Sequence, residues 1–369
     1  MTLESVELFR VAMPLVYPFR TAFGDEDCIE SLLVRLTSAG TYGWGEAAPW
    51  RSPAYSSECA ATAFIVARDF IAPLLIGQDI PSGQALQQHL AGIKGNQFAK
   101  AAFDLAWWDL HAKQAGEPLW KVLGGEAPVV DAGADFGVME SIDALLEAIG
   151  GAVEQGYKRV KLKYRPGWEL DMIGAVREAF GDTAIHVDCN SAYNLHDLDM
   201  FQRLDHYGLT MIEQPLSHDD LVDHAKLQAY LRTPICLDES ITSADRARKA
   251  LEIKACRWVN IKPGRVGGLT NALAVHDVCQ DMRVPCWVGG MLESAIGASH
   301  CLALATLPNI RYPSDIFPSE RFYAKDLATP PMTHSAPSQF TAADTPGIGV
   351  EPDPDMLEQC TLDHAFLER

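Results

Sequence analysis

The stretch RVKLKYRPG at residues 159–167 alternates apolar and basic side chains with the two-residue period of a β-strand. One side carries Val160, Leu162 and Tyr164, and the other carries Arg159, Lys161 and Lys163. A chain of 369 residues is long enough to hold a parallel sheet whose strands are covered on both faces. The basic side of this strand therefore points either to water or into a site, and the spacing of the neighbouring strands decides between the two.

The same ending, an apolar residue followed by a charged one, recurs in five predicted strands. The charged residues are Lys163, Asp188, Glu213, Asp238 and Lys262, at intervals of 25, 25, 25 and 24 residues. This interval suits one strand-and-helix unit of an α/β barrel, so we predict these charges at one level, at the carboxyl ends of consecutive strands. The same period predicts further strands near Asp135, Pro285 and Arg311. Eight positions result, which is enough to close a barrel.

Alternation within the strands then sets the direction of their polar side chains. Those predicted at the barrel mouth are Lys161, Lys163, Asp188, Asn190, Glu213, Asp238, Asn260 and Lys262. Three carboxylates on adjacent strands repel one another, and burial raises their pKa values unless a cation joins them. We therefore predict a divalent metal on Asp188, Glu213 and Asp238. Because all three are oxygen ligands, the expected ion is Mg²⁺, with Mn²⁺ as the alternative.

Two lysines on opposite sides of such a metal predict a specific chemistry. The amine of Lys163 or Lys262 can remove a proton α to a carboxylate, and the other amine can return a proton or stabilise the charge that the metal also stabilises. Lys161 is either structural or a neighbouring cation that lowers the pKa of Lys163. Another interpretation of the same charges is an internal layer of ion pairs that needs no metal.

The length of the chain and the change in its sequence pattern predict the domain organisation. The chain has 48% hydrophobic residues and a length that favours about two domains. We predict an α+β capping domain over residues 1–125, the barrel over 126–320, and a segment over 321–369 that returns to the cap. The predicted fold class is α/β, with a modified (β/α)7β barrel of the TIM type.

Composition excludes several classes of function. A formal charge of −19 without a basic patch argues against a nucleic-acid partner. No apolar run approaches the ~18 residues of a membrane helix, and MTLESVELFR at the start lacks the order of a secretory signal. Nine scattered cysteines without CxxC pairs indicate reduced thiols. We expect a cytoplasmic protein that forms a homo-oligomer, acts on a small carboxylate and binds no membrane.

The motifs at the strand ends resemble a known family. Together with Lys161 and Lys163, the segments HVDCN (186–190), IEQPL (212–216), CLDES (236–240) and NIKPGRVGG (260–268) are similar to the enolase superfamily in its muconate-lactonizing subgroup. The resemblance extends from PFRTAFG in the first domain to PGIGVE in the tail. It implies that Asp188, Glu213 and Asp238 bind the metal, that Lys163 and Lys262 form the acid/base pair, and that the first domain caps the barrel.

Within the subgroup, WVGGMLESAIG (287–297) is most similar to the o-succinylbenzoate synthases and the N-succinylamino acid racemases. This likeness implies dehydration of 2-succinyl-6-hydroxy-2,4-cyclohexadiene-1-carboxylate in menaquinone synthesis, with racemisation of N-succinylamino acids as the alternative. Two residues depart from the pattern. Ala298 stands where an arginine is usual, and Asp135 stands where a small hydroxyl residue is usual and is expected to repel a succinyl tail. Other barrel functions left open are a Schiff-base aldolase and a non-catalytic binding protein.

Further residues are expected to bind substrate or to support the site. These are Lys161, Asn190, Glu239, Arg265, Gly289 and Met291 in the barrel, and Phe19, Arg20, Phe23 and Tyr55 in loops of the cap. Glu239 is predicted to bend into the site from the opposite face of its strand. Arg265 either lowers the pKa of Lys262 or leaves the strand at the Pro263–Gly264 turn to pair with a surface carboxylate.

Overall fold

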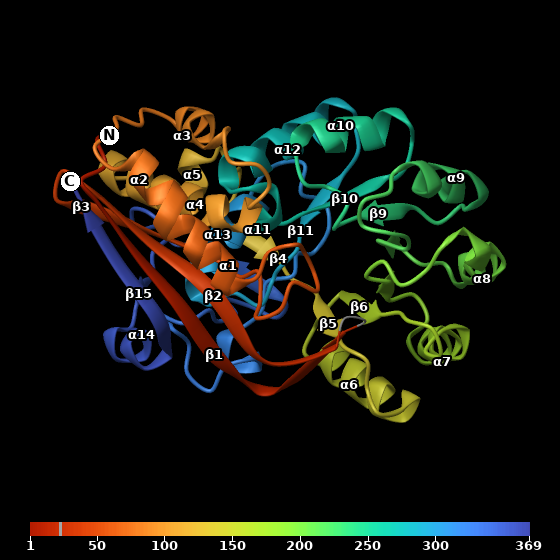
Figure 1. Cartoon of the computed structure of the whole chain (residues 1–369). Coiled ribbons are helices and arrows are strands. Elements are labelled where there is room, and N and C mark those ends of the chain that lie inside the picture. The colour runs from red at the N-terminus through yellow and green to blue at the C-terminus, as the bar shows by residue number, and fades with distance from the viewer. Residues whose placement is uncertain (22–23) are drawn as a thin grey trace.

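The computed structural model describes residues 1–21 and 24–369 (Figure 1). Its first part is an antiparallel sheet in the order β15-β1-β2-β3. The strands are β1 (Ser5–Thr21), β2 (Gly24–Ser38), β3 (Thr41–Ala47) and β15 (Thr361–Glu368). The last strand pairs with the first in a register that joins Ser5 to Glu368, so the two ends of the chain lie side by side. The predicted residue Phe23 lies outside the described residues.

Helices cover one face of this sheet. They are α1 (Ala60–Val66), the π-helix η1 (Ala67–Ile71), α2 (Ala72–Leu75), α3 (Gly83–Leu90), α4 (Gln97–Ala115) and α5 (Leu119–Val122). The longest, α4, packs directly on β3 because that strand carries glycines at the contact. A Cβ on Gly43 would lie 2.3 Å from the backbone nitrogen of Leu110, and one on Gly45 would lie 2.1 Å from the carbonyl oxygen of Ala102. Only residues without side chains allow this approach.

The second part is a parallel sheet that curls into a barrel. Its strands, in sheet order from one end to the other, are β5 (Ala134–Phe136), β6 (Arg159–Lys163), β7 (Ala184–Asp188), β8 (Ile212–Glu213), β9 (Ile235–Leu237), β10 (Trp258–Ile261) and β11 (Cys286–Val288). Residues 309–315 close the ring. The amide of Arg311 donates to Cys286 O at 2.9 Å, and the amide of Gly133 donates to Ser314 O at 3.0 Å. Seven of the eight predicted strand positions are strands, whereas the eighth, near Arg311, is an irregular segment joined to its neighbours by isolated bridges. The predicted fold class is confirmed.

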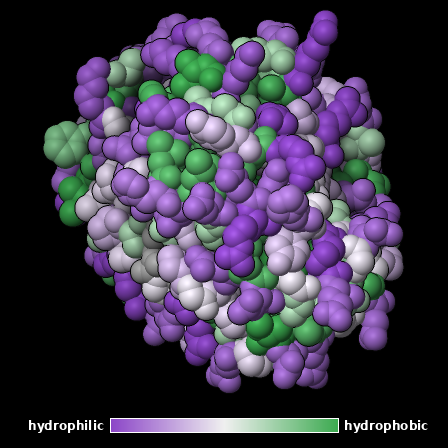
Figure 2. Space-filling model, turned by 90° about the vertical axis from the view of Figure 1, so that its right-hand side faces the viewer, coloured by the Kyte–Doolittle hydropathy of each residue, from purple (hydrophilic) through white to green (hydrophobic). Residues whose placement is uncertain are grey.

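Helices lie outside the barrel, between consecutive strands (Figure 1). They are α6 (Ile142–Glu154), α7 (Leu170–Phe180), η2 (Leu195–Asp197), α8 (Leu198–Leu204), η3 (Asp205–Tyr207), α9 (Val222–Tyr230), α10 (Ala244–Glu252), α11 (Pro263–Val266), α12 (Leu269–Asp281) and α13 (Ala295–Ala305). The face beyond α7, α8 and α9 is largely hydrophilic, with apolar groups scattered over it (Figure 2). None of the helices in residues 1–21 and 24–369 combines the length and the apolar character of a membrane span.

The tail after the barrel contacts both the barrel and the first sheet. It contains η4 (Ser319–Arg321), β12 (Ala328–Thr329), β13 (Gln339–Thr341), β14 (Glu351–Pro352) and α14 (Pro354–Cys360), and β13 pairs with β4 (Val129–Asp131) beside the barrel. Only the final strand, β15, joins the first sheet. The division at residues 125 and 320 therefore stays a proposal for the domain limits.

Candidate active site

Lys161 lies inside the barrel among three carboxylates. Its side chain is 2% exposed, and its Nζ lies 2.9 Å from Glu213 Oε2, 3.1 Å from Asp188 Oδ2 and 3.2 Å from Asp315 Oδ2. Burial lowers the pKa of Lys161, but the carboxylates, led by Asp188, raise it well above its usual value. The basic side of the strand at residues 159–163 therefore faces a buried charged cluster rather than water.

Lys163 lies above Lys161, at the end of β6. Its Nζ is 2.8 Å from Asp188 Oδ2 and 3.1 Å from Asn190 Oδ1. Burial alone would raise the pKa of Asp188, but Lys161 and Lys163 hold it below its usual range. Asn190 adopts a left-handed backbone conformation with φ 42°, and its Nδ2 donates to Glu239 Oε1 at 3.2 Å. Glu239 thus reaches the site, and burial raises its pKa to about 7.

Lys262 faces Lys163 from the other side of the barrel mouth. Its Nζ lies 2.9 Å from Asp238 Oδ2, 3.6 Å from Met291 Sδ and 4.6 Å from the centre of the Tyr55 ring. The hydroxyl of Tyr55 also donates to Asp238 Oδ1 at 3.0 Å. A Cβ on Gly289 would lie 2.7 Å from Lys262 Cε. Glycine at position 289 therefore leaves the room that the lysine side chain occupies.

Arg265 lies at the site rather than at the surface. It is buried in α11, its Nη1 donates to Asp238 Oδ1, and its Nε donates to Ile241 O at 2.8 Å. The predicted surface ion pair is wrong, because Pro263 begins a helix whose first turn directs the arginine back to the end of β9. The effect of Arg265 on the pKa of Lys262 stays a prediction. Burial lowers that pKa, but Tyr55 and nearby carboxylates, with Glu239 first among them, raise it above its usual value.

The three predicted metal ligands lie on adjacent strands. Asp188 and Glu213 are register partners, and Asp238 directly follows β9. Across the described part of the chain, no three His, Cys, Asp or Glu side chains converge into a ready-made metal site. The ammonium groups of Lys163 and Lys262 instead contact the oxygens that an ion would take. The donor set fits a hard divalent cation, since it consists of buried carboxylate oxygens, and the ion would displace these ammonium contacts.

A charged layer beneath the site was missed by the sequence analysis. Asp315 Oδ1 accepts from Arg159 Nη2 at 2.6 Å, and its other oxygen contacts Lys161. Asp315 follows the eighth strand position, so extending the strand-end pattern from Arg311 by four residues would have found it. His186 lies in the same layer, 3.4 Å from Glu213 Oε2, and burial lowers its pKa. These contacts hold the barrel interior in charge balance.

The capping domain contributes residues above the lysines. The ring centre of Phe19 lies 5.9 Å from Lys163 Nζ, and Trp50 Nε1 donates to Met291 O at 2.8 Å. Arg20 is exposed, lies 3.5 Å from Asp25, and lines a neighbouring pocket rather than the cavity between the lysines. That cavity measures about 30 Å³ and is bounded by residues that include Phe19, Tyr55, Asp135, Lys163, Asn190 and Lys262.

Comparison with known proteins identifies the family. Residues 4–124 match the model of the mandelate racemase / muconate lactonizing enzyme N-terminal domain, and residues 144–356 match that of the enolase C-terminal domain-like family. The chain is 44% identical to the o-succinylbenzoate synthase of Geobacillus kaustophilus, over 97% of this chain and 96% of that protein. It is 41% identical to the N-succinylamino acid racemase of Thermus thermophilus, over 98% of each. A solved enolase superfamily member from Listeria innocua superposes with a TM-score of 0.96 at 35% identity, over 100% of this chain and 99% of that one.

The fold and the site define an α/β-barrel enzyme with a capping domain. The chain belongs to the enolase superfamily, among the mandelate racemase and muconate lactonizing enzymes. Enzymes of this superfamily generally use Mg²⁺.

Proposed function

We propose that this chain is an o-succinylbenzoate synthase, which dehydrates 2-succinyl-6-hydroxy-2,4-cyclohexadiene-1-carboxylate to o-succinylbenzoate. The observation that carries the proposal is the opposed lysine pair. Lys163 and Lys262 reach one small cavity from opposite sides, and each lies within 2.9 Å of a carboxylate at the end of a strand. Full-length relatives of that name at 38–44% identity support the choice of substrate.

In the proposed reaction Lys163 is the base. It takes the proton α to the substrate carboxylate, and its ammonium group then gives that proton to the ring hydroxyl, which leaves as water as the ring becomes aromatic. Lys262 stays protonated and stabilises the negative charge that develops on the carboxylate. Tyr55 and Arg265 position Lys262 indirectly, because both hydrogen-bond to Asp238, which is its ion-pair partner.

The proposed metal ligands are Asp188, Glu213 and Asp238, with Mg²⁺ as the ion and Mn²⁺ as the alternative. When bound, the ion would supply positive charge beside the reacting carboxylate. Lys161 would remain beneath it, since its contact with Asp315 does not involve the proposed ligands. The expected cytoplasmic location and homo-oligomer remain predictions.

A second candidate is racemisation of N-succinylamino acids. The observation that favours it is that both lysines line one cavity, each on its own carboxylate, because a racemase needs an acid on one face of the substrate and a base on the other. Relatives with this name are 41% and 42% identical to the chain, close to the values for the synthases.

Purified protein assayed with both substrates tests the proposal. We expect o-succinylbenzoate to form in the presence of Mg²⁺, and Lys163→Ala to reduce its formation at least ~100-fold. Racemisation without dehydration would select the second candidate. Trapping of a carbonyl substrate by borohydride, with activity unaffected by EDTA, would instead indicate a Schiff-base aldolase. No turnover and no metal-dependent proton exchange on a panel of carboxylates would indicate a binding protein.

A further inference from the structure

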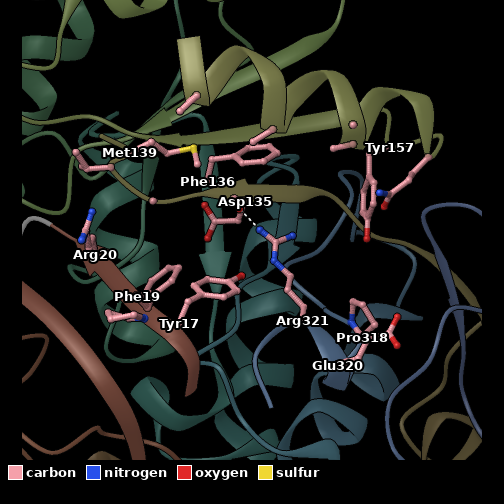
Figure 3. A pocket seen from close by; sticks show the side chains of 18 of the residues that line it. Tyr17, Phe19, Arg20, Asp135, Phe136, Met139, Tyr157, Pro318, Glu320 and Arg321 are labelled. Carbon is pink, nitrogen blue, oxygen red and sulfur yellow. Dashed lines mark hydrogen bonds between the residues drawn. The ribbon is translucent and has the colours of Figure 1, made fainter. Parts of the chain in front are cut away.

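A pocket of about 700 Å³ lies beside the lysine cavity (Figure 3). Its walls come from four separate parts of the chain: the end of β1, residues 135–157, residues 318–321 and His334. Figure 3 shows the Arg321 side chain between these walls, directed towards Asp135. Phe136, Met139 and Tyr157 provide much of the apolar lining.

The two cavities share a wall. Phe19 and Asp135 line both of them, and the Phe19 ring lies 5.9 Å from Lys163 Nζ. A volume of about 30 Å³ holds roughly one water molecule, so the lysine cavity accepts the reacting atoms of a substrate but not an acyl chain attached to them. The adjoining pocket has room for such a chain once the Phe19 side chain turns aside.

The pocket contains a cation without a carboxylate partner. Within the described residues, the Arg321 guanidinium makes one hydrogen bond, from Nη2 to the carbonyl oxygen of Asp135, and no ion pair. Its Cζ lies 5.0 Å from the ring centre of Phe317, 5.3 Å from that of Phe322 and 5.8 Å from that of Phe136. Aromatic stacking holds the planar group in place, while most of its five N–H donors stay available for an anion.

Within the described residues, no carboxylate forms an ion pair with Arg321. The Asp135 carboxylate is buried, and its Oδ1 has no hydrogen-bond partner in the part of the chain that the structure describes. Glu140 and Glu320 are exposed to solvent, where their charges are screened. His334, also exposed, is paired with the Tyr157 hydroxyl at 2.8 Å. Arg321 is thus the partly buried charge that a ligand in this pocket would meet.

We propose that this pocket receives the acyl tail of the substrate and that Arg321 pairs with a carboxylate at the end of that tail. The inference rests on the proposed function, because the other end of the same substrate reacts at Lys163. It assigns the substrate class as acyl compounds with a distal carboxylate, of which a succinyl group is one. Asp135 takes part in this arrangement through its backbone carbonyl, which orients Arg321.

The test compares an N-succinylamino acid with the N-succinamoyl analogue, whose tail ends in a neutral amide of the same shape. Exchange of the α-proton with deuterium is followed for both compounds in wild type, Arg321→Gln and Arg321→Lys. Wild type should prefer the succinyl compound in kcat/KM by roughly 10- to 100-fold, the range expected for a charge-assisted bidentate pair. Arg321→Gln should lose this preference, and Arg321→Lys should keep part of it.

Arg248→Gln is the matched control, because it removes one positive charge from a surface helix where Arg248 pairs with Asp245 and Glu252. Its preference should equal that of wild type. A preference that survives in Arg321→Gln, or is absent from wild type, would overturn the inference. If neither compound exchanges in wild type, the proposed function fails. The role of the pocket is then tested separately by calorimetry, which measures the binding of the two compounds. Tighter binding of the succinyl compound that Arg321→Gln abolishes would support the pocket, and equal binding of the two compounds would overturn it.

Discussion

Replacing Lys161 by methionine tests the charge balance of the barrel interior. Methionine keeps the length of the side chain but removes the cation that lies 2.9–3.2 Å from three buried carboxylates. Asp188 retains Lys163 as a partner and Asp315 retains Arg159. Among the described residues, Glu213 keeps only His186 as an ionisable partner, and burial lowers the pKa of that histidine. Loss of one partner from a buried ion pair costs about 3–5 kcal/mol of unfolding free energy.

The pH dependence of this loss follows from Glu213. Burial and Asp188 raise the pKa of Glu213, but Lys161 and His186 bring it below its usual value. This lowered pKa contributes stability above about pH 4.3, and the contribution disappears as the pH falls below that value. Without Lys161 the pKa of Glu213 rises, so the deficit of Lys161→Met should be largest near pH 7 and should shrink towards pH 4.

Urea unfolding without metal, followed by circular dichroism at several pH values, measures the effect. Lys158→Met is the control, since Lys158 is exposed, directly precedes β6 and makes no ion pair within the described residues. Its unfolding free energy should stay within ~0.5 kcal/mol of wild type. Saturating Mg²⁺ should stabilise Lys161→Met more than wild type, because the ion replaces the missing positive charge. An unfolding free energy of Lys161→Met equal to that of the control would contradict the role of Lys161 as the cation that balances these carboxylates.

Three further predictions follow from the contacts of the site and the cap. Asp238→Asn should lose at least ~100-fold in metal-dependent turnover while its circular dichroism spectrum stays unchanged; full activity after EDTA treatment of wild type would contradict the metal site. Lys163→Ala should lose dehydration by at least ~100-fold, and Lys262→Ala should lose both dehydration and any racemisation; near-normal turnover of either variant would contradict its role. Glu46 is buried and accepts hydrogen bonds from Ser294 and Gly297, and burial raises its pKa to about 7. The native protein therefore binds one more proton than the unfolded chain between about pH 4.3 and 7, and it loses stability as the pH rises through that window. Glu46→Gln should therefore gain roughly 3 kcal/mol relative to wild type between pH 5 and pH 8 in urea unfolding, and a pH-independent difference would argue against this titration.

The strand-end spacing was sufficient to predict the barrel and the residues that meet at its mouth. Side-chain alternation determines direction as long as the backbone stays extended, which holds for Lys161 and Lys163 in β6. The rule stops where a strand ends. Asn190 has a positive φ, and Arg265 lies in a helix. The contacts of Asn190 with Glu239 and of Arg265 with Asp238 therefore depend on the backbone conformation after the strand, which the periodicity of the sequence does not predict.

Residues that meet through long-range packing were the hardest to predict. Asp315 follows an irregular segment that closes the barrel through isolated hydrogen bonds rather than as a regular strand, so the strand spacing leads to Arg311 and reaches Asp315 only when it is extended by four residues. Arg321 lies in a short 3₁₀ turn, and its contact with Asp135 joins positions 186 residues apart. Such contacts arise when the tail packs against the barrel and the hairpin of the cap, and local sequence does not encode them.

In the proposed mechanism Lys163 and Lys262 act on opposite faces of one α-carbon, with Mg²⁺ on the carboxylates between them. Deuterium exchange of the two enantiomers of an N-succinylamino acid, followed by NMR in wild type and in each lysine variant, tests this most directly. We predict Mg²⁺-dependent exchange of both enantiomers in wild type, loss of one enantiomer's exchange in Lys163→Ala, and loss of the other's in Lys262→Ala. Equal loss for both enantiomers in either variant, or exchange in wild type that persists after EDTA, would contradict the account.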